Sequence, residues 1–89
     1  MIINDIVLEE KIFERLKSRH QRTLVLDFNE EYKAGTFLNI TLGYWELSPN
    51  RTRELKPWPS IGLLAKINMA QRVESKIVLE VVVVYSDQP

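Results

Sequence analysis

The strongest constraint on this chain is the run IVLEVVVVY at residues 77–85, in which Glu80 is the only charged residue. β-Branched side chains lose rotamer freedom in a helix and fit the pleated surface of a sheet, so the run predicts a strand. A strand this apolar needs cover on both faces, either from its own chain or from a partner subunit. The fold must therefore contain a sheet.

Two further segments show the period-two alternation of a strand. Residues 23–28 and residues 36–47 each place every second side chain, mostly apolar, on one face. A polar connection that ends in Gly35 separates them. We expect the two segments to form an antiparallel pair across a loop.

The N-terminal segment predicts a helix that begins at Asn4 or Asp5 and ends near His20. Asn and Asp are good N-cap residues, and Phe13 and Leu16 fall on one apolar stripe. Acidic residues come early in the segment and basic residues late, which matches the helix macrodipole. We therefore expect this helix to pack on the sheet.

Residues 61–72 fit two structures. Their composition of Leu, Ala, Lys, Met, Gln and Arg favours a helix capped by Ser60, whereas their apolar residues alternate as in a strand. With the helix, the fold is an α+β domain with a small, mostly antiparallel sheet and the order α-β-β-α-β. With the strand, it is one helix and a four-stranded antiparallel sheet. Residues 48–60 contain Pro49, Pro57 and Pro59 and predict an irregular loop in either case.

Composition limits the class of protein. The 89 residues have room for a single domain, 1–89, and the hydrophobic share of 45% is typical of a chain that folds. Twelve basic and twelve acidic residues give a net charge of zero. No Cys and one His leave no disulfide, no thiolate site and no expected metal or other cofactor. Without a signal peptide or a membrane-spanning run, we expect a cytoplasmic protein that does not associate with membranes.

Basic and aromatic residues suggest contacts to nucleic acid or to a small ligand. Cations at the end of the predicted helix can bind phosphates, although cations also gather at helix C-termini to offset the dipole. Trp58, in the proline-rich loop, can stack on a base or plug the edge of the core. The candidate contacts are Arg15, Lys17, Arg19, Arg22, Arg51, Arg53 and Trp58. A ligand pocket lined by Tyr44, Trp45 and Trp58 is a further alternative.

No residue pattern indicates catalysis. Asp27, Glu30, Glu31 and Glu80 are not brought together by their spacing, and the chain has no phosphate-binding loop or nucleophile motif. We therefore expect a non-enzymatic interaction domain that self-associates, as a homodimer, through the strand at residues 77–85 or through an aromatic face. The expected interface residues are Phe37, Trp45, Val82 and Val84. A protein partner other than a second copy fits the same surface.

Overall fold

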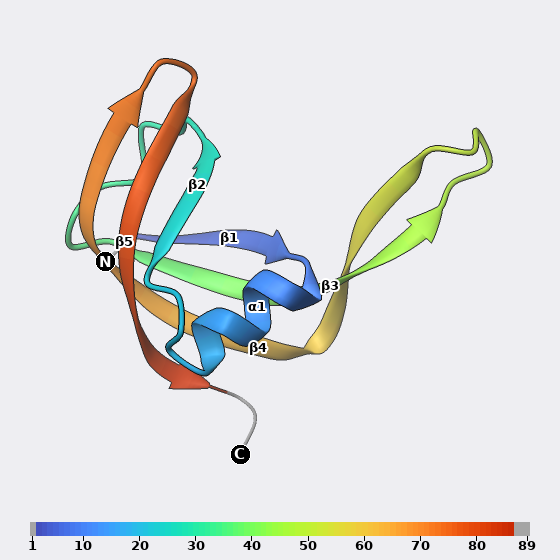
Figure 1. Ribbon diagram of the computed structural model, residues 1–89, viewed down its shortest axis with the longest axis horizontal. Coiled ribbons are helices and arrows are strands. Elements are labelled where there is room, and N and C mark those ends of the chain that lie inside the picture. Colours follow the sequence, from blue (N-terminus) through green and yellow to red (C-terminus); the bar gives the residue numbers. More distant parts are fainter. Residues whose placement is uncertain (1, 87–89) are drawn as a thin grey trace.

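The computed structural model describes residues 2–86, which form a curled, mixed five-stranded sheet and one short helix (Figure 1). The elements are β1 (Ile3–Leu8), α1 (Glu10–Lys17), β2 (Thr23–Asp27), β3 (Phe37–Leu47), β4 (Arg53–Val73) and β5 (Lys76–Ser86). The strand order is β1-β3-β4-β5-β2, with β1 parallel to β3 and the other pairs antiparallel. The protein is mostly β, so both expected α+β arrangements, α-β-β-α-β and one helix with four antiparallel strands, were wrong.

The N-terminal segment begins as a strand and not as a helix. β1 pairs with β3 in parallel, from Ile3 opposite Phe37 to Leu8 opposite Leu42. α1 then begins after Glu9 and has eight residues, with Phe13 and Leu16 buried. The local sequence favours a helix here, but pairing with the edge of β3, about thirty residues further along the chain, outweighs that preference.

The segment at residues 61–72 is part of β4, so the periodicity predicted it correctly and the composition did not. Leu63, Ala65 and Ile67 are each no more than 1% exposed and point into the core. β3 and β5 lie on the two sides of this part of β4 and bond its backbone. Ladders on both sides outweigh an intrinsic helix propensity that amounts to only tenths of a kcal/mol per residue.

The proline-rich segment is also more regular than expected, because β4 begins at Arg53. Pro57 lies opposite Gly43 of β3, and residues 53–62 have no pairing to β5. A strand with one free edge tolerates proline, which has no N–H to donate on that side. Pro57 and Pro59 therefore lie on an edge of the sheet and do not break β4, whereas Pro49 lies in the turn between β3 and β4.

β2 pairs with β5 and not with β3, so the expected antiparallel pair of residues 23–28 and 36–47 was wrong. β5, the strand predicted from residues 77–85, lies between β4 and β2. Its alternate side chains Ile77, Leu79 and Val81 are buried on the inner face of the sheet. The opposite side, which we term the outer face, has no second layer among the described residues.

The core fills the space enclosed by the curled sheet, with α1 packed on the inner face (Figure 1). It consists of Leu8, Phe13, Leu16, Leu24, Leu38, Ile40, Leu63, Ala65, Ile67, Ile77, Leu79 and Val81. No charged or polar residue is fully buried in the described part of the chain. In that part, no helix has the length and apolar character needed to cross a membrane.

Candidate interaction surfaces

A partly exposed apolar patch lies on the outer face where β1, β3, β4 and β5 are side by side. We define the outer patch as Ile3, Phe37, Leu64, Val82 and Tyr85. Phe37 and Val82 lie on either side of Lys66, two strands apart and therefore about 10 Å from each other. Ile3 and Tyr85 border a shallow depression of about 300 Å³. Two of the four expected interface residues thus share one surface.

The other two expected interface residues lie elsewhere. Trp45 follows Phe37 by eight positions on β3, a distance of about 26 Å along the strand. Val84 is the extra residue where the β4–β5 register shifts between Leu64 and Ala65, and it is exposed. The structure therefore does not place Phe37, Trp45, Val82 and Val84 on one compact surface.

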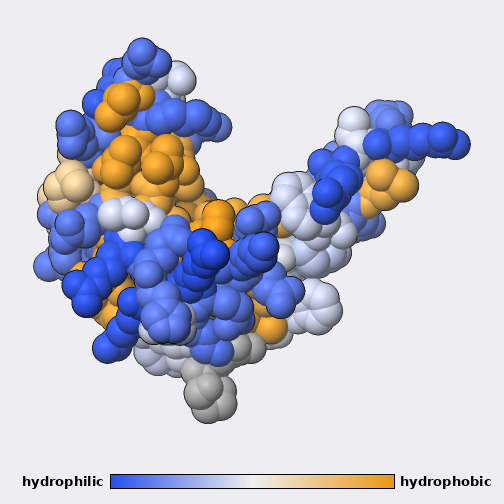
Figure 2. All heavy atoms as spheres, viewed as in Figure 1, coloured by the Kyte–Doolittle hydropathy of each residue, from blue (hydrophilic) through white to orange (hydrophobic). Residues whose placement is uncertain are grey.

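The outer face continues over β5 and β2 with further apolar side chains. Val25 of the edge strand β2 lies opposite Val78 and is 64% exposed. Figure 2 shows hydrophobic surface gathered over this part of β2 and β5. At the end of the strand pair, Asp27 and Lys76 form an exposed ion pair. Charges of both signs therefore border the apolar surface.

The far end of the β3–β4 hairpin projects from the rest of the molecule as a two-stranded arm (Figure 1). We define the arm as residues 43–58. Alternation divides its side chains between two faces. The polar arm face carries Tyr44, Glu46, Glu54, Lys56 and Trp58, and the apolar arm face carries Trp45, Leu47, Leu55 and Pro57 together with Arg53 near the tip.

Contacts along the arm hold its side chains in place. On the polar arm face, the rings of Tyr44 and Trp58 meet edge to face, with centroids 5.5 Å apart. On the apolar arm face, the guanidinium of Arg53 lies 4.8 Å from the centroid of the Trp45 ring. Trp45 is still 48% exposed and Leu47 64% exposed, because no other described element covers them. The arm thus presents an ordered apolar surface to solvent.

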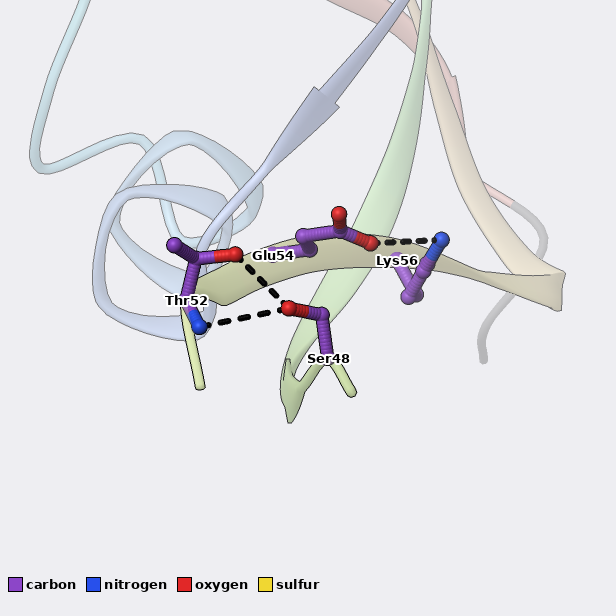
Figure 3. Close-up of polar contacts among 4 residues, drawn as sticks. All are labelled: Ser48, Thr52, Glu54 and Lys56. Carbon is purple, nitrogen blue, oxygen red and sulfur yellow. Dashed lines mark hydrogen bonds and ion pairs between the residues drawn. The ribbon is translucent and has the colours of Figure 1, made fainter. Parts of the chain in front are cut away.

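The arm tip is closed by hydrogen bonds across the turn that connects β3 to β4 (Figure 3). The hydroxyls of Ser48 and Thr52 are 2.7 Å apart, and the Thr52 N–H donates to Ser48 Oγ at 3.2 Å. Further along β4, Lys56 Nζ lies 3.0 Å from Glu54 Oε2, and this hydrogen bond raises the pKa of Lys56. The tip residue Arg51 has a positive φ of 62° and an exposed side chain. The tip is therefore ordered and positively charged.

At its base the arm meets the start of α1. A depression of about 260 Å³ there is lined by Tyr44 and Trp45 of the arm and by Glu9, Glu10 and Lys11. Neither glutamate forms an ion pair with another described residue. The base of the arm consequently combines aromatic side chains with two carboxylates, and the tip carries cations.

The basic residues at the end of α1 border a third depression, of about 290 Å³. Arg19, Gln21 and Arg22 line it together with apolar side chains of α1 and β5. The last carbonyls of α1 accept hydrogen bonds from backbone N–H groups of residues 18–21, so the arginines are not needed to satisfy them. Arg15 and Lys17 belong to the last turn of α1. This end of α1 is thus positively charged.

The predicted nucleic-acid contacts do not form one surface. Arg51 and Arg53 lie at the far end of the arm, whereas Arg15, Arg19 and Arg22 lie at the opposite end of the molecule (Figure 1). The predicted pocket of Tyr44, Trp45 and Trp58 is not formed either, because Trp45 points to the arm face opposite to the other two residues. Both groupings were predicted from the chemical type of the residues and not from a known spatial arrangement.

The titratable groups form no catalytic arrangement in the described part of the chain. No three His, Cys, Asp or Glu residues there lie close enough to hold a metal ion. His20 Nδ1 is 3.1 Å from Ser18 Oγ, and both residues are exposed. Burial raises the pKa of Tyr32, which packs against the core. The contacts of His20 and Tyr32 are those of residues that stabilise the fold.

Several exposed or half-buried apolar residues of these surfaces were not singled out from the sequence. Ile3, Leu64 and Tyr85 join the outer patch, and Leu47 and Leu55 form part of the apolar arm face. The signal was available for Leu47, which shares its side of the strand with Trp45 by simple alternation. For Ile3 there was no such signal, because the segment was expected to be helical.

Comparison of the chain with known protein families and with curated proteins finds no match.

Proposed function

We propose that this protein is a non-enzymatic interaction domain that self-associates as a homodimer through apolar surface of its sheet. The observation that carries the proposal is the amount of ordered apolar surface that the described residues leave uncovered. Large side chains such as Leu47, Val25 and Tyr85 are each more than 60% exposed although they lie on regular strands. Exposed patches of this kind mark interaction sites in folded proteins.

A second copy is the occupant that the charges favour. The chain has equal numbers of basic and acidic residues, so two copies do not repel each other at long range. Both signs of charge are present beside the apolar surfaces, including Lys66 within the outer patch and the Asp27–Lys76 pair. A two-fold arrangement brings the same surface of each copy together and can pair such charges reciprocally.

The test is the molar mass in solution by size-exclusion chromatography with light scattering. Samples from micromolar to hundreds of micromolar are measured at low and at moderate salt. We expect the mass of a dimer, with little dependence on salt because apolar burial dominates the contact. A monomer mass across the whole concentration range refutes the proposal.

The basic depression between α1 and β5 supports a second candidate function, the binding of single-stranded nucleic acid. Arg19 and Arg22 supply cations, and the apolar lining offers a surface on which a base can stack. Neither arginine forms an ion pair with a described residue, so neither charge is neutralised locally.

This candidate is tested with a fluorescent single-stranded oligonucleotide titrated at several salt concentrations. Binding through phosphates weakens as salt rises, with a slope of about −0.7 per contacted phosphate on logarithmic axes. The double variant Arg19→Ala/Arg22→Ala should lose this binding, whereas Lys11→Ala, on the other end of α1, should retain it. Equal binding by both variants rules out the depression as the site.

A further inference from the structure

Among the described residues, the apolar face of the arm lacks a second layer that would cover it. This face carries Trp45, Leu47 and Leu55 on one side of a ribbon that is only two strands wide. A two-stranded ribbon is marginally stable by itself and needs a layer against its apolar face. Leu55 is half-buried at the base of the arm, where its side chain and that of Val7 both lie beside Gly43. Leu47 is 64% exposed, and Trp45 is still 48% exposed beside the Arg53 guanidinium.

The charges at the two ends of the arm are opposite. The tip carries Arg51 and Arg53, and the depression at the base is lined by Glu9 and Glu10, with Lys11 as its one cation. Neither Arg51 nor the two glutamates form an ion pair within the described chain. The arm is therefore complementary to itself when a second arm is laid against it in the reverse direction.

We infer that the arms of two copies pack antiparallel, apolar arm face to apolar arm face, with the tip arginines of each copy at the acidic base of the other. This inference rests on the proposed self-association and assigns it to one surface. Trp45 and Leu47 of both copies become the shared apolar centre, and each dimer contains the contact between tip and base twice. The outer patch then takes no part in the dimer.

The apolar centre is tested with two lysine variants at positions of equal exposure. Leu47 on the arm and Val25 on β2 are both 64% exposed, so either substitution is accommodated on the free monomer. Leu47→Lys should raise the dissociation constant of the dimer roughly a hundredfold, because two charges enter a desolvated centre. Val25→Lys should leave it unchanged. Circular dichroism and thermal unfolding confirm that both variants are folded.

The reverse direction of the arms is tested by charge exchange. Arg51→Glu alone and Glu10→Arg alone each place like charges at both tip-to-base contacts and should weaken the homodimer about tenfold. An equimolar mixture of the two variants should form a heterodimer of nearly wild-type affinity. In that heterodimer one contact is the natural pair and the other is the same pair with its charges exchanged.

The outcomes separate this inference from the proposed function. A wild-type protein that stays monomeric refutes both. A wild-type dimer that persists in Leu47→Lys and dissociates in Val82→Lys or Val25→Lys overturns the arm pairing and leaves self-association through the outer face standing. Dissociation by Leu47→Lys without recovery in the mixed sample overturns the antiparallel arrangement of the arms.

Discussion

Gly43 is the position at which a single methyl group tests the packing between the arm and the body. It is buried where β3 leaves the body of the sheet, and a Cβ there would lie 2.6 Å from Val7 Cγ1 and 2.8 Å from Leu55 Cδ1 and Cγ. Carbon atoms in contact are normally about 3.5–4.0 Å apart. The Gly43→Ala variant must therefore displace side chains from two different strands.

The expected change in the free energy of unfolding is the difference between two opposing effects. Overpacking of this kind costs about 1–3 kcal/mol, and replacing glycine by alanine within a strand returns about 0.5–1 kcal/mol. We expect Gly43→Ala to lower the free energy of unfolding by about 1–2 kcal/mol. For a chain of this size the melting temperature should fall by roughly 5–15 °C.

The assay is a double-mutant cycle of urea unfolding at one fixed protomer concentration. Val7 is β-branched and cannot turn aside as easily as Leu55, so Val7→Ala should relieve most of the overlap. In that background the penalty of Gly43→Ala should shrink by about 1 kcal/mol. Gly35→Ala is the control, since Gly35 has open space around it and a φ of +92°, and its penalty should not depend on Val7. An unchanged Gly43→Ala penalty would refute the steric argument.

Three further predictions concern the body of the sheet. Asn4→Leu should stabilise the protein by about 1 kcal/mol in urea unfolding, because Asn4 Nδ2 is buried with no hydrogen-bond partner in the described part of the chain. Phe13→Ala should cost about 3–5 kcal/mol, since Phe13 is fully buried, while the exposed Lys11→Ala should change the unfolding free energy by less than about 0.5 kcal/mol. The raised pKa of Tyr32 means that the folded state holds the phenol proton more tightly than the unfolded state. Its stabilising effect should be present below about pH 10 and be lost as the pH rises further, and Tyr32→Phe should remove this part of the pH dependence.

The hydrophobic pattern of a segment correctly predicted the strands that are specified by their own side chains. The run at residues 77–85 forms β5, and the alternation in residues 36–47 forms β3. The same period of two was correct for residues 61–72, where helix-favouring composition was the misleading signal. Alternation of apolar residues reflects packing against other strands, whereas composition reflects only the intrinsic preference of the isolated segment.

The elements that were missed depend on partners distant in the sequence. β1 is a strand because β3 offers it a parallel edge, and nothing within residues 3–8 signals that edge. The same reason explains the candidate site. Apolar residues of the outer face such as Phe37 and Val82 could be identified, but the strand order that brings them within about 10 Å could not. The arm was hidden by its prolines, which were interpreted as the end of regular structure.

The pairing of β2 with β5 has a consequence for how the chain is made. A nascent chain that has emerged as far as β4 can pair β1, β3 and β4, but β2 has no partner until β5 follows. Much of the inner face, including Leu79 and Val81, is missing until then. Pairing β2 with β5 closes a long loop, which is slow, and until then the unpaired strand edge can lead to aggregation. Folding of this domain should therefore be completed only after β5 has been synthesised.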